Sequence, residues 1–420
     1  MSVPVRRGAG SAAPAALEDV WRREAPHVLA ALLRRYSDLE RCQDALQDAA
    51  EDALAWETDG VPDNPRGWLV RVASRRLIDA LRSDGARRAR EEADHERDAR
   101  SAVVPAADET PSTDADDTLQ LLLLCCHPSL SRSSQVALCL RSVGGLGVDD
   151  IAAAYLVPVR TMTQRLTRAR ATLREAGARF AMPSADELPD RVAAVLDACH
   201  LMFTAGYTRA SGEALLDEAL TAEAIRLVRQ VVAALPDHDE AAGALALMLL
   251  TNARAGARTD GAGDLVPLAE QDRRRWARAP IAEGVALLER VLPRGPVGRY
   301  QLTAAIAAVH DEAATWEDTD WPQICELYAM LTHVAPSPVV TLNRAVAVAM
   351  VDGPGAGLAM LEDLRADAAM RDHHRLHAVR AHLLEEAGDL DGARESYARA
   401  AQLTRSVPEQ RYLNRRLAAL

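Results

Sequence analysis

The chain has 420 residues, of which 49% are apolar and 26% are charged. This length exceeds one ordinary hydrophobic core, so we expect two to four domains in a globular protein dominated by helix. The net charge of −12 argues against a protein that coats nucleic acid along its whole surface. All 49 basic residues are arginine, a pattern that GC-rich codon usage explains, so only arginine clustering carries functional information.

The cysteines and the N-terminus indicate a cytoplasmic protein. Six cysteines are scattered along the chain without any CxxC pair, as expected of reduced thiols. The first residues contain no apolar segment suited to a secretory signal. The longest apolar run, Leu119–Cys126, is too short to span a bilayer, so we expect no membrane partner.

A first helical unit is predicted over residues 17–90. Apolar residues recur at helical spacing in residues 20–33 and again in residues 45–54. The turn-rich residues 57–65 lead into a third helix, in which Trp68 lies on the apolar side and is assigned to the core rather than to base stacking. The arginines of this helix that its apolar side leaves facing outward are Arg71, Arg75, Arg76 and Arg82.

Two arginine-dense segments flank an acidic one. Residues 66–90 carry eight arginines against two acids, and residues 160–179 carry six against one. Residues 91–117 carry ten acids and two arginines, and their prolines predict an acidic flexible linker without helix. Because phosphate neutralisation supplies most nucleic-acid affinity, this layout predicts two separate polyanion-binding regions.

A second helical unit, residues 118–182, ends in the form of a helix-turn-helix. Residues 148–155 and the helix from residue 159 are separated by a short turn that ends in Pro158. The last helix has a buried stripe with 3-4-3 spacing, formed by Met162, Leu166, Ala169 and Leu173. Its other side carries residue types that read the major groove, namely Arg160, Thr163, Gln164, Thr167 and Arg168. A solvated arginine-rich helix in a bundle is the alternative.

Residues 185–420 are predicted to be helical, with a repeat signal. The same pattern of apolar residues begins at Ile324, at Ala359 and at Ala393. The distances between these starting residues are close to the 34-residue period of tetratricopeptide repeats. Residues 251–280 interrupt this period. Such helix pairs stack into a curved solenoid with a surface for peptide or protein, and an irregular helical bundle is the alternative.

Three segments resemble bacterial RNA polymerase sigma factors. The sequence CQDALQDAAEDAL (residues 42–54) resembles the helix that docks on core polymerase. Residues 59–82 resemble the segment that opens and reads the −10 promoter element, and residues 151–175 are similar to the −35-reading helix-turn-helix. The motifs DGVPDNP, QDRRRWARAPIAEG and PEQRYLNRRLAAL resemble the extracytoplasmic-function subgroup with a C-terminal tetratricopeptide-like extension.

The resemblance implies an all-α protein that carries no catalytic residue, metal site or cofactor. It implies sigma region 2 in residues 17–90, region 4 in residues 118–182, a linker in a polymerase channel, and a regulatory domain in residues 185–420. The implied partners are promoter DNA, the β′ clamp and β flap of core polymerase, and a protein or intramolecular contact for the last domain.

The implied site residues fall into three groups. The −10 residues, in and after a loop that would hold a flipped base, are Asp63, Asn64, Arg71, Arg75, Arg76 and Arg82. The −35 residues are Arg160, Thr163, Gln164, Thr167 and Arg168, with Arg170 and Arg174 on phosphates. The polymerase-docking residues are Asp44, Gln47 and Asp48. The alternative is a helix-turn-helix regulator with a repeat sensor domain that never joins the polymerase.

Overall fold

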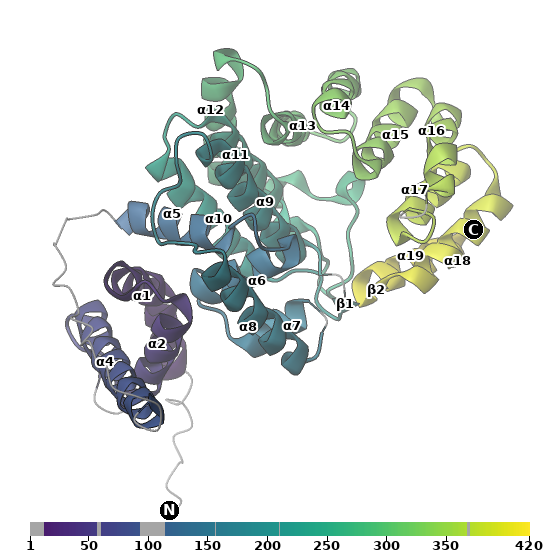
Figure 1. Ribbon diagram of the computed structural model, residues 1–420. Helices are drawn as coiled ribbons and strands as arrows, with labels where there is room; N and C mark the ends of the chain where they lie inside the picture. Colours follow the sequence, from purple (N-terminus) through teal and green to yellow (C-terminus); the bar gives the residue numbers. More distant parts are fainter. Residues whose placement is uncertain (1–11, 57–59, 93–113, 156, 210, 368–369) are drawn as a thin grey trace, which may run out of the picture. The chain divides into compact units, whose positions relative to one another are not determined.

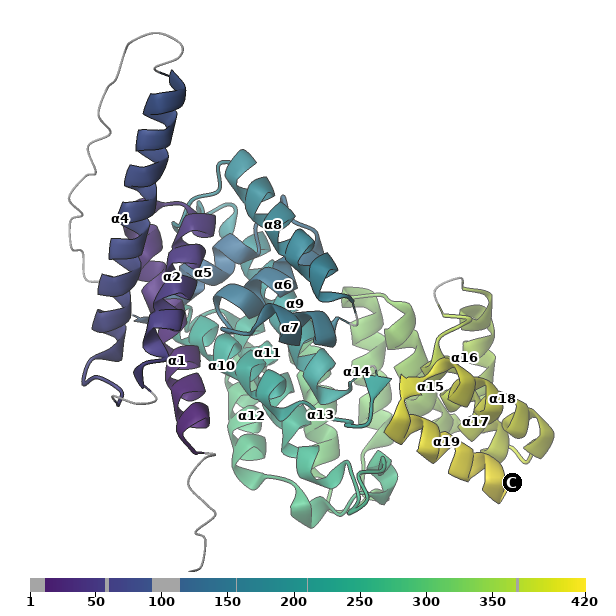
Figure 2. The same cartoon turned by 90° about the horizontal axis from the view of Figure 1, so that it is seen from below.

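The computed structural model describes residues 12–56, 60–92, 114–155, 157–209, 211–367 and 370–420. The chain is all-α, as predicted, and divides into two compact units, residues 1–198 and 199–420 (Figures 1 and 2). The boundary lies within helix α9 (Leu188–Tyr207). Among the described helices, none has both the length and the apolar character needed to cross a bilayer.

Three helices in the described part of unit 1 pack on one another through alanine and leucine. They are α1 (Ala12–Tyr36), α2 (Leu39–Ala53) and α4 (Pro65–Glu92). The Asp38 carboxylate caps α2 by accepting a hydrogen bond of 3.1 Å from the Arg41 backbone NH. Pro65 stands at the start of α4, where its missing NH is not needed. Trp68 is half-buried, with its ring 5.0 Å from that of buried Trp56.

The second half of unit 1 consists of α5 (Asp114–Cys125), α6 (Arg132–Ser142), α7 (Val148–Ala154) and α8 (Val159–Glu175). The predicted stripe of α8 is buried, which confirms its helical register. The linker prediction was wrong at both margins, since α4 continues to Glu92 and α5 begins at Asp114. Asp117 is buried because it forms an ion pair with Arg34 of α1. Residues 93–113 lie outside the described part, and so does the proposed path of the linker through a channel.

Unit 2 is built around α11, which is buried along most of its length. Its first helices after α9 are α10 (Glu218–Ala234), α11 (Asp239–Ala253), α12 (Arg278–Val291) and α13 (Arg299–Glu312). Three short 3-10 turns, Ala255–Ala257, Leu268–Glu270 and Arg273–Arg275, form the predicted interruption between α11 and α12, and a fourth, Leu292–Arg294, follows α12.

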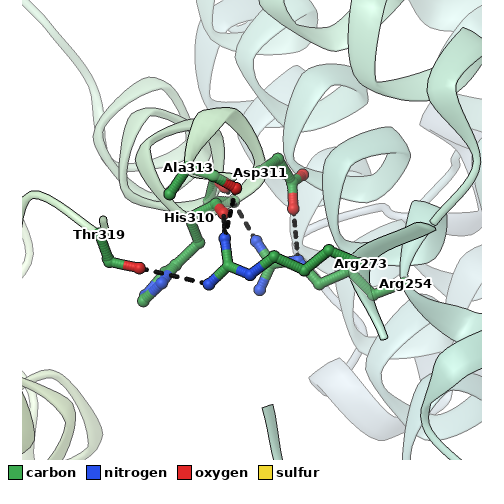
Figure 3. A network of polar contacts seen from close by, with 7 residues as sticks. Arg254, Arg273, His310, Asp311, Ala313 and Thr319 are labelled. Carbon is green, nitrogen blue, oxygen red and sulfur yellow. Dashed lines mark hydrogen bonds and ion pairs between the residues drawn. The ribbon is translucent and has the colours of Figure 1, made fainter. Parts of the chain in front are cut away.

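Two buried arginines anchor this interruption to the end of α13 (Figure 3). Arg254 forms an ion pair of 2.6 Å with Asp311, and Arg273 donates to the backbone oxygens of His310 (2.6 Å) and Ala313 (2.7 Å). The terminal carbonyls of a helix have no partner within the helix, so these contacts satisfy them. The arginine-rich sequence at residues 273–275 is therefore in part structural.

The remaining helices follow one another, each packed on its neighbour in the chain (Figure 1). They are α14 (Trp321–Val334), α15 (Pro338–Asp352), α16 (Pro354–Ala366), α17 (His374–Glu386), α18 (Leu390–Leu403) and α19 (Val407–Ala419). Two predicted starting residues, Ile324 and Ala393, are buried on α14 and α18. The start at Ala359 was wrong, since Ala359 is exposed and Gly357 begins the buried 0-4-7 set of α16.

The end of the chain returns to the beginning of unit 2. Strand β1 (Ser211–Gly212) pairs in parallel with β2 (Arg405–Ser406). Asp264, from the loop after α11, forms ion pairs with Arg411 and Arg415 of α19. These contacts fasten the last helix of the series to the first part of unit 2.

Candidate nucleic-acid interface

A basic groove of about 710 Å³ runs along α4 and the end of α1. The predicted residues Asn64, Arg71, Arg75 and Arg82 line it, together with two arginines that the prediction did not include, Arg35 and Arg66. Asp79 is the acid that lines the groove among the described residues. A cationic groove of this size suits a polyanion backbone whose bases are unpaired.

The arginines of the groove differ in whether they already form an ion pair within the protein. Arg66 forms an ion pair of 2.8 Å with buried Glu24 of α1. Although burial raises the pKa of Glu24, Arg66 and Arg23 lower it below its ordinary value. Arg71 and Arg75 are exposed and have no ion-pair partner in the part of the chain that the structure describes. These two side chains are therefore free to neutralise phosphate.

Arg76 points away from the groove. Its guanidinium contacts both carboxylate oxygens of Asp52 on α2, at 2.8 and 2.9 Å. Hydrogen bonding to Asp52 raises the pKa of Arg76. The expectation that Arg76 contacts DNA is not supported by this geometry, because its bidentate partner is a carboxylate on another helix.

The loop before α4 is fixed at its end by Asn64. The Asn64 side chain accepts a hydrogen bond of 2.8 Å from the Gly67 backbone NH, and the same residue lines the groove. A Cβ at Gly67 would lie 2.7 Å from the Asn64 amide nitrogen, so a larger residue there would displace the Asn64 side chain. Asp63 is exposed beside the groove but does not line it, and residues 57–59 of the predicted base pocket lie outside the described part.

A second basic surface lies on α8. The five predicted residues, Arg160, Thr163, Gln164, Thr167 and Arg168, are all exposed along one side of the helix. The Thr163 hydroxyl donates to the Val159 carbonyl at 3.0 Å. Arg165 lies over the ring of Tyr155, and the Tyr155 hydroxyl donates to the Ser133 carbonyl on α6. These contacts fix α8 relative to α6 and α7.

The other predicted residues lie on α2. Asp44, Gln47 and Asp48 are exposed. Partial desolvation raises the pKa of Asp44, against the opposing effect of the Arg170 guanidinium. The amide oxygen of Gln47 accepts a hydrogen bond of 2.7 Å from Arg141 of α6. Of the arginines expected on phosphates, Arg174 instead forms an ion pair of 2.9 Å with Glu40.

Comparison with known proteins bears on the part of the chain that contains α1, α2 and α4. The model of sigma-70 region 2 matches residues 20–87, which contain the groove and the exposed side of α2. A 29% identical relative from Mycobacterium tuberculosis, named probable ECF RNA polymerase sigma factor SigI, matches over 158 residues, or 37% of this chain and 53% of that one. The region 2 match and this relative support an RNA polymerase sigma factor. These matches indicate no enzyme family.

Sequence similarity to another protein extends beyond residues 20–87. A Rhizobium meliloti (strain 1021) protein, named uncharacterized protein R00370, is 38% identical over 394 residues, and the match covers 93% of each chain. This sigma factor and the Rhizobium protein are thus members of one family along nearly their whole length. Residues 191–292 match a family of unknown function (DUF6596), which runs from α9 to α12. No solved structure matches the chain at a significant level.

Proposed function

We propose that this sigma factor is of the extracytoplasmic-function type and confers recognition of promoters with a −10 and a −35 element. The observation that carries the proposal is the pair of exposed basic surfaces, the α4 groove and the outer side of α8, on separate helical subdomains. Initiation requires one surface for melted strand and one for duplex, and the two surfaces differ accordingly in shape and residue type.

The α4 groove is the proposed site for the melted −10 strand. Arg71 and Arg75 would neutralise its phosphates, and Arg35 and Arg82 flank them. Asn64 lines the groove, where its amide can hydrogen-bond a flipped base while its oxygen holds α4. The groove is wide and cationic, as single-strand sites commonly are.

The exposed side of α8 is the proposed reader of the −35 duplex. A recognition helix contacts base edges in the major groove through its N-terminal residues, and Arg160, Thr163 and Gln164 lie in the first two turns of α8. Arginine suits guanine and glutamine suits adenine in that groove. Helices α7 and α8 would then form the helix-turn-helix.

Core polymerase is the proposed partner of α2. Its exposed Asp44, Gln47 and Asp48 present carboxylates and an amide, which fit a surface that carries arginine. In this arrangement the β′ clamp would bind α2, and the β flap would bind the subdomain that contains α8. The neighbouring ion pair between Arg76 and Asp52 would hold α2 and α4 in a fixed register.

Unit 2 is proposed to modulate activity through protein contacts, as a tetratricopeptide-like domain. Its support is the series α14–α19, in which successive helices pack on their chain neighbours, as in solenoids. The chain as a whole is acidic, which does not favour nucleic acid as the partner of this part.

The test is run-off transcription with purified core polymerase. The wild-type chain should co-purify with core and start transcripts, Arg168→Ala should weaken duplex −35 recognition, and Arg75→Ala should weaken promoter opening. A chain that neither co-purifies with core nor starts transcripts would contradict the proposal. A chain that binds promoter duplex without core would instead favour a helix-turn-helix regulator.

A further inference from the structure

A small cavity lies in unit 1, beside the turn from α1 to α2 and the end of α8. Its volume is about 260 Å³, the share of roughly nine water molecules at about 30 Å³ each. It has no lining residue in common with the α4 groove. The cavity therefore has room for one small organic molecule and is too small for a nucleic-acid strand.

Four leucines give this cavity an apolar wall. Leu33 of α1, Leu39 of α2, Leu124 of α5 and Leu173 of α8 all line it, and none of them is more than 8% exposed. Water next to such a wall finds few hydrogen-bond partners. A hydrocarbon group therefore displaces this water favourably, as in most small-molecule sites.

A glycine turn after α8 places Arg179 and Phe180 on the same cavity. Gly177 has a φ of 63°, which glycine adopts without strain. The backbone NH of Gly177 donates to the Arg174 carbonyl at 3.1 Å, and that of Ala178 donates to the Leu173 carbonyl at 3.0 Å. These two hydrogen bonds are the usual pattern at a helix end, so the position of the residues after α8 follows from the sequence.

The charged side chains of the lining are mostly basic. They are Asp38, Glu40, Arg170, Arg174 and Arg179. Glu40 already forms an ion pair of 2.9 Å with Arg174, and Asp38 forms one of 3.5 Å with Arg41. The other two arginines of the lining form no ion pair within the described part of the chain. The lining thus lacks an anion for them.

Arg170 is the better placed of these two arginines, since it is half-buried whereas Arg179 is exposed. The Nε atom of Arg170 is buried and has no hydrogen-bond partner among the described residues. The Arg170 charge acts on the pKa of Asp44, but these two residues form no ion pair. A buried donor without an acceptor costs free energy, and a carboxylate can satisfy two guanidinium donors at once. Arg170 therefore marks the position of an anionic group.

We propose that the cavity binds a small monocarboxylate with an apolar body of about six or seven carbon atoms. Its carboxylate pairs with Arg170, and its apolar body lies against the four leucines. A phosphate fits less well, because the leucines offer no hydrogen-bond donors to its oxygens. Benzoate and hexanoate have the required size and charge.

The test is isothermal titration calorimetry of the full-length chain with benzoate and with hexanoate. A ligand of this size that binds with even a low free energy per atom has a Kd below about 10 mM, so we expect saturable binding in that range. Benzyl alcohol has the ring without the charge, and inorganic phosphate has a charge without the ring. Each should bind at least about tenfold more weakly than benzoate. These comparisons use the wild-type chain, so they do not depend on the folding of a variant.

Two variants locate the binding site. Arg170→Gln removes the charge and should weaken benzoate binding by about tenfold or more. Ala178→Phe places a ring in the cavity, which Ala178 lines, and should abolish binding while Arg170 remains. Arg365→Gln, at an exposed arginine of α16, is the matched control and should bind benzoate within about twofold of wild type.

Several results would overturn the inference. One is the absence of saturable binding of both carboxylates to the wild-type chain. Another is binding of benzyl alcohol or inorganic phosphate as tight as that of benzoate. Unchanged benzoate binding by both Arg170→Gln and Ala178→Phe would place the ligand outside this cavity. Polymerase and DNA take no part in this binding, so its failure would leave the proposed function untouched.

Discussion

Arg75 and Arg76 are adjacent in sequence and both exposed, but we predict that their replacement has different effects. Arg75 lines the α4 groove without an ion-pair partner among the described residues, whereas Arg76 is held by Asp52. Arg75→Ala should remove one phosphate contact. The slope of log affinity against log salt should then become less steep by about 0.7, the value for one contact to single-stranded DNA.

This slope converts into a measurable ratio. Between about 50 and about 200 mM salt, the affinity deficit of Arg75→Ala relative to wild type should shrink about 2.6-fold. Holoenzyme binding to a forked promoter fragment with an unpaired −10 strand, followed by fluorescence anisotropy, measures it. Arg76→Ala is the matched control and should keep the wild-type slope. The assignment of the groove would be refuted if Arg76→Ala changed the slope and Arg75→Ala did not.

Three further predictions concern stability. Burial lowers the pKa of His310 to about 3 and raises that of Asp311 to about 6. Between about pH 4 and pH 6, His310 is therefore protonated only in the unfolded chain, and Asp311 is protonated only in the folded chain. The two groups have opposite effects on the pH dependence of stability, and His310→Gln leaves only that of Asp311. In this variant the free energy of unfolding, measured in urea, should fall with rising pH by up to about 1.4 kcal/mol per pH unit relative to wild type. A pH profile parallel to that of wild type would contradict this. Gly357→Ala should lower the free energy of unfolding, measured in urea, by about 1–3 kcal/mol, because the new Cβ would lie 2.7 Å from a backbone oxygen of α15. Gly355→Ala is the control and should not lower this free energy, because no atom lies within 4 Å of the new Cβ. A chain ending at Pro183 should melt at a lower temperature than one that retains α9, whose first half contacts α5 and α6 through hydrogen bonds and an ion pair; equal melting temperatures would argue against this role of α9.

The helical registers could be predicted from the sequence because they depend on local spacing. The stripe from Met162 to Leu173 is buried as its period requires, and this fixes which side of α8 is exposed. The register of α16 could not be predicted in this way. Gly357 is buried because the backbone of α15 lies close to it. A sequence pattern that counts apolar side chains does not detect a position where close packing requires glycine.

The membership of the α4 groove depends on tertiary contacts, which spacing does not reveal. Arg35 reaches the groove from the end of α1, far from α4 in the sequence. Arg76 leaves it because Asp52 on α2 lies within hydrogen-bond distance. Asp117 was predicted to lie in the linker, but Arg34, 83 residues earlier, gives it a buried partner. In each case a charged side chain is placed by a partner that the local sequence does not contain.

The central claim is that this sigma factor reads two promoter elements with two separate surfaces. Transcription from a randomised promoter library, with purified core polymerase and sequencing of the transcripts, tests it most directly. We predict two enriched sequence elements upstream of the start site, and Arg168→Ala should relax selection in the −35 element alone. Enrichment of a single element, or equal loss of selection in both elements by Arg168→Ala, would contradict the account.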